Sequence, residues 1–282
     1  MLLGFNLLLW TTHVTDEHLP LFAQLKRAGY DGVELPVFEG GPAHFARLGR
    51  VLKDEGLRCT GVTVLPDAAH SSISPDPACR QGAVERLRWA IDCLAAAGGE
   101  VLAGPFYQPL GQFTGEPPTT AEREGIVATH REAAEHAAGL GIKLSVEPLN
   151  RFECHALNTV ADAAAVVAGV DRPNYGLLYD TFHTNIEEQD PLGVIAPNLA
   201  GINHVHVSEN DRGTPGKGHV PFEAVFRELK AGGYDGWYVI EAFGRALPAL
   251  AAATRVWRDF FPAREEVYRF GHDHLREAWA RA

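Results

Sequence analysis

Short apolar runs alternate with longer helical patterns along the whole chain of 282 residues. The runs are bounded by glycine, proline or polar turn residues, which is typical of buried strands. The helical patterns between them stop repeatedly at glycine, as at Gly29 and Gly56, where a helix commonly ends. We therefore predict eight strands, at residues 3–10, 30–35, 58–65, 100–106, 143–147, 176–179, 202–207 and 237–241.

The segments between these runs predict helices at residues 16–28, 42–56, 79–98, 121–139, 158–170, 191–199 and 222–231, with 248–282 mostly helical. Alternating strands and helices form a parallel sheet, and eight such units favour a closed (β/α)8 TIM barrel of the α/β class. A doubly wound open sheet is the alternative, but no Gly-x-Gly-x-x-Gly follows the first strand. Without any linker signal, we predict one barrel domain over residues 1–282 with a C-terminal helical extension.

Composition excludes several classes of partner. The formal net charge of -11 argues against nucleic acid, whose binding needs basic patches. The four cysteines form no C-x-x-C pair, which indicates a reducing compartment. No apolar run reaches the roughly 20 residues that span a bilayer, and the first residues lack the features of a signal peptide. We expect a cytoplasmic protein that binds neither membrane nor nucleic acid.

Four successive predicted strands end in an ionisable residue: Glu147, Asp180, His206 and Glu241. In a (β/α)8 barrel, the carboxyl ends of the strands surround the active site. Three carboxylates and one imidazole at one point destabilise each other unless a cation joins them. With no thiolate, the set suits Mn²⁺, Mg²⁺ or Co²⁺ better than a structural Zn²⁺, and Mn²⁺ is the ion that we expect first. The alternative for any one of the four is an ordinary salt bridge.

The sequence around these strand ends resembles the xylose-isomerase-like TIM-barrel sugar isomerases and epimerases. Within them it is most similar to the group of D-tagatose, D-psicose (allulose) and L-ribulose 3-epimerases. The likeness covers the barrel and is specific from the fifth strand onward. Four stretches carry it: EPLNRFE from Glu147, DTFHTNIEE from Asp180, HVHVSENDR from His204 and IEAF from Ile240.

The resemblance implies a role for seven residues. Those matching the metal ligands of the family are Glu147, Asp180, His206 and Glu241. Two of these also match its paired acid/base carboxylates: Glu147 and Glu241. Those matching residues that hold the hydroxyl and carbonyl oxygens of the substrate are Glu153, His183 and Arg212. The resemblance further implies a homo-oligomer, dimeric or tetrameric.

The expected activity is a metal-dependent ketose 3-epimerase that removes and returns the C3 proton through a cis-enediolate. The alternatives on the same scaffold are an aldose–ketose isomerase, a hydroxypyruvate isomerase and a keto-inositol dehydratase or isomerase; outside enzymology, the alternative is a barrel that binds ligand without catalysis. No Walker-type loop is present, so we expect an unphosphorylated sugar. Lys217 is the residue that argues otherwise, because its charge could receive a phosphate or carboxylate.

Other residues near the strand ends carry weaker expectations. Glu34 either supports the metal site or makes an ordinary salt bridge. We expect His204 to pack away from His206, on the view that strand alternation separates them. Four aromatic residues either line a sugar pocket or only pack: Trp10, Phe106, Tyr107 and Phe113.

Overall fold

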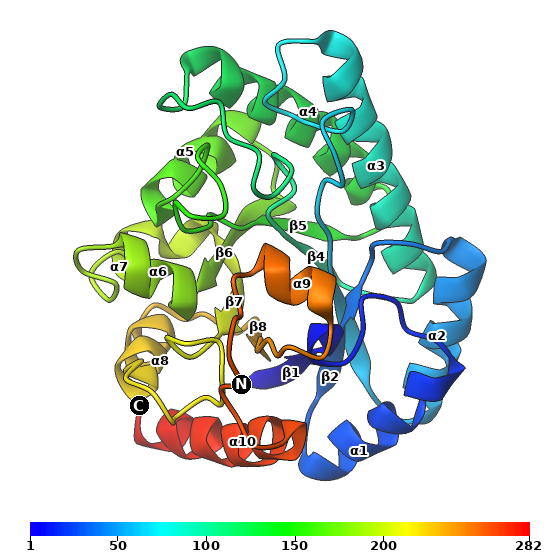
Figure 1. Cartoon of the computed structure of the whole chain (residues 1–282), viewed down its shortest axis with the longest axis vertical. Coiled ribbons are helices and arrows are strands. Elements are labelled where there is room, and N and C mark those ends of the chain that lie inside the picture. Colours follow the sequence, from blue (N-terminus) through cyan, green and yellow to red (C-terminus); the bar gives the residue numbers. More distant parts are fainter.

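Eight parallel strands close into a barrel in the computed structural model, which describes all residues, 1–282 (Figure 1). Each strand pairs with the next along the chain, and the eighth returns to the first. The predicted (β/α)8 barrel is confirmed. The strands are β1 (Leu2–Asn6), β2 (Gly32–Pro36), β3 (Arg58–Val62), β4 (Val101–Gly104), β5 (Lys143–Val146), β6 (Tyr175–Asp180), β7 (Ile202–Val207) and β8 (Trp237–Ile240).

Helices surround the barrel as an outer ring (Figure 1). The ring is closed by the last helix, which packs against α8 on one side and α1 on the other. Its members are α1 (Pro20–Ala28), α2 (Pro42–Asp54), α3 (Pro77–Ala96), α4 (Thr120–Ala138), α5 (Val160–Val170), α7 (Ile195–Asn198), α8 (Phe222–Ala231) and α10 (Arg264–Arg281). Further short elements are α6 (Thr181–Glu187), α9 (Pro248–Ala253) and the 3-10 turns η1 (Leu7–Leu9), η2 (Asp16–His18) and η3 (Leu199–Gly201).

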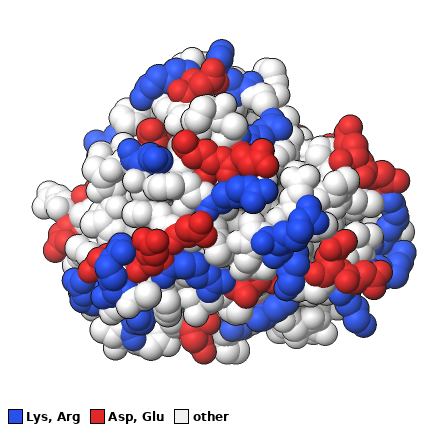
Figure 2. Space-filling view, turned by 90° about the horizontal axis from the view of Figure 1, so that it is seen from below, with Lys and Arg blue, Asp and Glu red and all other residues white.

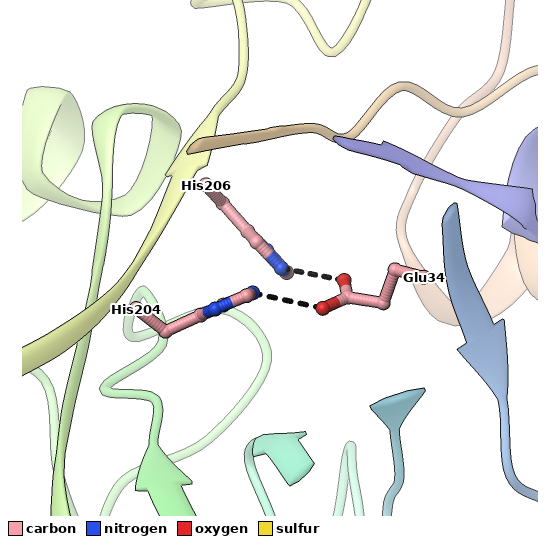
Figure 3. Close-up of side chains that lie close together, drawn as sticks. All are labelled: Glu34, His204 and His206. Atoms are coloured by element: carbon pink, nitrogen blue, oxygen red, sulfur yellow. Dashed lines mark hydrogen bonds and ion pairs between the residues drawn. The ribbon is translucent and has the colours of Figure 1, made fainter. Parts of the chain in front are cut away.

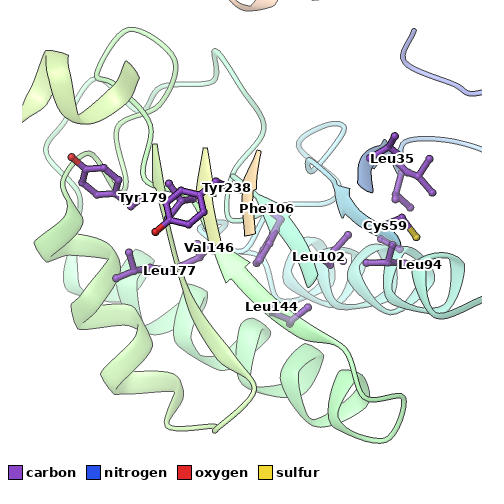
Figure 4. Packing of buried hydrophobic residues seen from close by; sticks show 14 of the residues in the cluster. Leu35, Cys59, Leu94, Leu102, Phe106, Leu144, Val146, Leu177, Tyr179 and Tyr238 are labelled. Atoms are coloured by element: carbon purple, nitrogen blue, oxygen red, sulfur yellow. The ribbon is translucent and has the colours of Figure 1, made fainter. Parts of the chain in front are cut away.

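The core lies between the strands and the ring of helices. One cluster of 60 buried residues makes up most of the core, and two small clusters, of five and three buried residues, lie beside it. Figure 4 shows part of this core: Leu102, Leu144 and Leu177 belong to the successive strands β4, β5 and β6, and Leu94 of α3 lies near Leu102. Parallel strands covered on both faces are apolar along most of their length, which explains the uninterrupted runs in the sequence.

The structure departs from the predicted elements at two places that matter for the site. The first strand ends at Asn6 instead of continuing to Trp10, because the Asn6 side chain accepts a hydrogen bond from the Leu8 N–H (2.8 Å) and caps the turn η1. The helix α6, which was not predicted, begins directly after Asp180. Asp180 Oδ1 caps this helix by accepting from the Phe182 N–H (2.6 Å), the role that Asp commonly has at a helix start.

A buried histidine ties helix α4 to the barrel. His130 Nε2 lies 3.1 Å from the carbonyl oxygen of Phe106, and Nδ1 lies 2.5 Å from the Tyr175 hydroxyl. Since a carbonyl only accepts, Nε2 carries the proton and the neutral ring is satisfied at both nitrogens. Burial lowers the pKa of His130 from its usual 6.5 to about 4.

This histidine is expected to make the protein less stable in acid. Because its pKa is lower in the folded than in the unfolded protein, its contribution is complete above pH 6.5 and falls as the pH drops toward 4. The shift corresponds to a loss of about 3 kcal/mol. Urea unfolding at pH 7 and pH 4 should show this extra loss in the wild type but not in His130→Gln, whose amide can keep both hydrogen bonds without titrating. An equal pH dependence of the two proteins would contradict the prediction.

The surface carries both signs of charge. On the face drawn in Figure 2, Lys and Arg side chains are interspersed with Asp and Glu and do not form a continuous basic stripe. None of the helices combines the length and the apolar character that crossing a membrane requires.

Candidate active site

The ends of strands β5 to β8 meet at the carboxyl-terminal mouth of the barrel. Glu147, Asp180, His206 and Glu241 each place one ligand atom within 4.8 Å of all the others. The four side chains are almost fully buried, with at most 4% of any residue exposed. The structure therefore brings together the four residues that the strand pattern singled out, and this set could hold a metal ion.

Two atoms in this cluster have no hydrogen-bond partner: His206 Nδ1 and Glu147 Oε1. His206 Nδ1 lies 3.6 Å from Glu241 Oε1, 3.9 Å from Asp180 Oδ2 and 3.9 Å from Glu147 Oε1. Buried polar atoms are rarely left unpaired. A cation between the imidazole nitrogen and the three carboxylate oxygens could be bound by all four atoms. Three oxygens with one imidazole nitrogen form a donor set suited to Mn²⁺, Mg²⁺ or Co²⁺.

The two glutamates of the cluster have different electrostatic surroundings. Burial raises the pKa of Glu147, and the nearby charges of Glu241 and Asp180 raise it further. Burial alone would also raise the pKa of Glu241, but the Arg212 guanidinium and His206 outweigh it and hold this pKa below its usual value. Glu241 is thus the more readily ionised of the pair.

Arg212 reaches the cluster from the loop that follows β7. Its Nη1 donates to Asp180 Oδ2 (3.3 Å) and to Glu241 Oε2, and its guanidinium lies between the rings of Phe182 (4.1 Å) and Phe243 (4.7 Å). Arg212 has a positive φ of 64°, an unusual conformation for a residue other than glycine. Such a conformation persists only when the surrounding structure holds it.

The loop that carries Arg212 is organised around a buried carboxylate that the sequence did not reveal. Glu209 is fully buried and accepts from the backbone N–H groups of Gly216 (2.8 Å) and Val220 (2.9 Å). The added Cβ of any other residue at Gly218 would lie 2.5 Å from Glu209 Oε1. The glycines of this loop therefore allow it to wrap closely around Glu209.

His183 faces two hydrogen-bond donors. The Asn150 backbone N–H donates to Nδ1 (2.9 Å), and Arg212 Nη2 lies 2.7 Å from Nε2. Burial and the charge of Arg212 lower the pKa of His183, so the ring is neutral and can accept at only one nitrogen. Since the backbone of Asn150 is fixed, Nδ1 is the acceptor and Nε2 carries the proton. An acceptor oxygen that receives both N–H groups would satisfy these two donors.

A cleft of about 810 Å³ opens beside the cluster of candidate metal ligands, none of which is among its lining residues. Glu153 and Arg212 line it, and the Asn150 amide holds Glu153 Oε1 at 2.7 Å. The segment after α9 forms one wall, anchored by Val256 on an apolar cluster that includes Phe243. The other lining residues are Phe113, Asn150, Arg151, Phe152, Phe182, Ile186, Asn210, Asp211, Thr254, Arg255, Arg258 and Phe260.

The structure corrects the expectation for His204. It lies on the same side of β7 as His206, with ring centroids 5.3 Å apart, because side chains two positions apart in a strand share a face. Its Nε2 lies 2.8 Å from Glu34 Oε2, so it belongs to a polar group and not to an apolar packing contact. Glu34 also contacts His206 and is therefore connected to the candidate metal site.

Of the four aromatic residues that either line a pocket or pack, only Phe113 lines the cleft. Phe106 and Tyr107 are fully buried in the core, and Trp10 packs on Phe5 and Tyr268. Lys217 does not line the cleft; its ammonium lies 4.1 Å from the ring centre of Phe270.

Asn6 is a further contact that sequence reasoning missed. Its Nδ2 lies 3.2 Å from Glu241 Oε1 and 3.0 Å from Glu34 Oε1. The signal that could have found it is its place at the end of a strand, the same rule that singled out the other four residues. The continuous apolar pattern up to Trp10 concealed that end.

Comparison with known proteins agrees with the barrel fold. The family described as xylose isomerase-like TIM barrel matches residues 22–278. A ketose 3-epimerase of Arthrobacter globiformis is 33% identical over 280 residues, which cover 98% of this chain and 96% of the relative. An L-ribulose 3-epimerase of Methylomonas sp. (strain DH-1) is 34% identical over 237 residues, which cover 83% of this chain and 82% of the relative.

Solved structures show the same likeness over the whole chain. The crystal structure of D-allulose 3-epimerase from Methylomonas sp. in complex with D-allulose has a TM-score of 0.91 and 30% identity, and the match covers 99% of this chain and 97% of that one. D-psicose 3-epimerase with D-tagatose from Clostridium cellulolyticum H10 has a TM-score of 0.89 and 25% identity over 99% of each chain. The chain belongs to the xylose isomerase-like TIM barrel family.

Proposed function

We propose that this chain is a metal-dependent ketose 3-epimerase acting on unphosphorylated sugars. The chain is an isomerase or epimerase by its relatives, which are named ketose, L-ribulose and D-psicose 3-epimerases. The observation that carries the finer proposal is the pair of buried carboxylates, Glu147 and Glu241, which reach one polar cluster from non-neighbouring strands.

A single divalent ion is proposed for this cluster, held by Glu147, Asp180, His206 and Glu241. The unpaired atoms Glu147 Oε1 and His206 Nδ1 support it, as does the absence of thiolate from the donor set. Mn²⁺ is the proposed ion, with Co²⁺ and Mg²⁺ as substitutes. When bound, such an ion supplies Lewis-acid polarisation of the sugar's C2 carbonyl and C3 hydroxyl.

The proton transfers fall to the two glutamates. Inversion at C3 requires that one group remove the proton from one face of the sugar and another return a proton to the opposite face. Glu241, which Arg212 and His206 keep ionised, and Glu147, which has an unpaired oxygen, provide one carboxylate for each face. General acid–base groups act in this way when they lie within hydrogen-bond reach of the moving proton.

The sugar oxygens are proposed to be held by His183, Arg212 and Glu153. Support comes from the two donors, His183 Nε2–H and the Arg212 guanidinium, that face each other without an acceptor. An oxygen of a bound ketose that accepts from both groups would relieve this contact. Glu153, in the wall of the cleft and fixed by Asn150, can accept from a sugar hydroxyl.

An unphosphorylated substrate is favoured by two observations. Lys217, the residue in which the sequence suggested a contact to a charged substrate, lies over Phe270 outside the cleft. The Methylomonas relative with a TM-score of 0.91 was solved with D-allulose, a free sugar.

Deuterium labelling tests the proposal. Metal-loaded protein incubated in D₂O with free ketoses is expected to place deuterium at C3 of both epimers, because each is formed through the same planar intermediate. Mass spectrometry and NMR of the products locate the label, and a panel of ketoses, aldoses and hydroxypyruvate identifies the preferred substrate. Label at C1 together with an aldose product would instead assign an aldose–ketose isomerase.

A further inference from the structure

We infer that Glu34 is a positioning residue for the proposed metal site, holding the ring of His206 so that Nδ1 faces the three carboxylates. The inference rests on the proposed ligand set. Figure 3 shows the arrangement: Glu34 extends from β2 across the barrel, and His204 and His206 extend from β7 to meet one of its oxygens each.

The contacts of Glu34 leave its carboxylate no freedom. Its Oε1 accepts from His206 Nε2 (2.8 Å) and Asn6 Nδ2 (3.0 Å), and its Oε2 accepts from His204 Nε2 (2.8 Å) and the Thr60 hydroxyl (2.9 Å). The residue is 0% exposed. Four donors from four different positions therefore satisfy the four lone pairs of a buried carboxylate.

The consequence for His206 follows from the chemistry of its two nitrogens. An ionised carboxylate only accepts, so the nitrogen next to Glu34 Oε1, which is Nε2, carries a proton. In the neutral ring, the form in which a histidine binds a metal, this leaves the lone pair on Nδ1. Nδ1 is the atom that lies 3.6–3.9 Å from the oxygens of Glu147, Asp180 and Glu241. Glu34 therefore sets both the tautomer and the orientation of the His206 ring, although Glu34 is not itself a proposed metal ligand.

The same network reaches a second proposed ligand. Asn6 donates to Glu34 Oε1 and lies 3.2 Å from Glu241 Oε1. Its amide cannot be turned over, because Asn6 Oδ1 accepts from the backbone N–H of Leu8 at 2.8 Å. Strands β1 and β2, which supply no metal ligand, therefore orient ligands that come from β7 and β8.

Glu34, His204 and His206 also lie close enough together to form a metal site of their own. Two features argue for hydrogen bonds instead. Both N–O separations are 2.8 Å, the length of a charge-assisted hydrogen bond. In addition, Asn6 and Thr60 occupy the remaining lone pairs of Glu34, so none is left for a cation.

Metal affinity, measured without substrate, tests the role of Glu34. Metal-free wild type and Glu34→Gln are titrated with Co²⁺ against a competing chelator, and the visible spectrum of bound Co²⁺ is recorded. Loss of a partner that orients a metal-bound histidine typically weakens metal binding by about 10- to 100-fold. We expect a loss of this size in Glu34→Gln, with a changed spectrum, because the amide keeps the shape of the side chain but not its charge.

The matched control is Glu122→Gln. Glu122 is another buried carboxylate beside a histidine, 3.2 Å from His155 Nε2, but it lies in the outer ring at the start of α4. Its replacement removes part of a helix cap and so tests whether lost stability alone weakens metal binding. The control should bind Co²⁺ as the wild type does.

A second measurement needs no variant. In the NMR spectrum of Mg²⁺-loaded wild type, the ring proton of His206 should be on Nε2; a proton on Nδ1 would overturn the inference. Unchanged Co²⁺ affinity in folded Glu34→Gln would overturn it as well. Failure of the proposed metal site itself looks different: the wild type would then bind no Co²⁺, or His206→Ala would bind it as tightly as the wild type.

Discussion

Exhaustive removal of divalent metal is expected to reduce turnover to background, and return of Mn²⁺ or Co²⁺ to restore it. Without a cation, three carboxylates lie buried together, and their repulsion is relieved only by protonation or by the neighbouring Arg212 and His206. Burial and neighbouring charges raise the pKa of Glu147, which shifts it toward the neutral form that cannot act as a base. Metal removal therefore takes away the polarising ion and also disfavours the ionised form of one proton carrier.

The measurement is kcat on a free ketose, with metal content determined in the same sample. His206→Ala should lower metal affinity and require added metal for any activity. His136→Ala is a suitable control, since His136 pairs with Asp92 (2.7 Å) between helices α3 and α4 of the outer ring. Full turnover by protein verified to be free of metal would disprove the proposal.

The strand ends were predictable because two simple regularities coincide. Apolar runs marked where strands β5 to β8 stop, and barrel closure brings all parallel strand ends to one mouth. These two regularities group four residues without any distance between them being known: Glu147, Asp180, His206 and Glu241. The helix α6 was missed because its seven residues are too few for a periodic pattern, although its capping residue, Asp180, was identified for another reason.

The supporting contacts were not predictable in the same way. Asn6 and Glu241 are 235 positions apart, and Glu34 and His206 are 172 apart; no local pattern encodes either distance. These pairs meet only across the closed barrel. His204 was misplaced for a different reason, since the period of two in a strand already places it beside His206.

The second large effect is expected when either proposed proton carrier is replaced. Glu147→Gln and Glu241→Gln should each lose at least ~10²-fold in kcat, the lower end for removal of a general acid–base group. The two variants should differ in metal retention. Asn6 and Arg212 both donate to Glu241, and a glutamine can accept from only one of them without presenting its own N–H to the other. Metal content must therefore be measured beside kcat in both variants.

Exchange at C3 distinguishes loss of a proton carrier from loss of metal. A variant that keeps metal and one carboxylate can still remove the C3 proton from the face that this carboxylate contacts and return a solvent proton to the same face. Glu147→Gln should then exchange deuterium at C3 with solvent in one epimer only, and Glu241→Gln should do so in the other epimer only. Neither variant should interconvert the epimers at the wild-type rate.

Single-base chemistry predicts a different pattern. If one glutamate both removed and returned the proton, its replacement would stop exchange in both epimers, and replacement of the other would leave exchange intact in both. Separate incubation of each C3-deuterated epimer with each variant therefore decides between the two mechanisms. Because Glu147 and Glu241 approach the same cluster from β5 and β8, we expect the complementary pattern that two faces require.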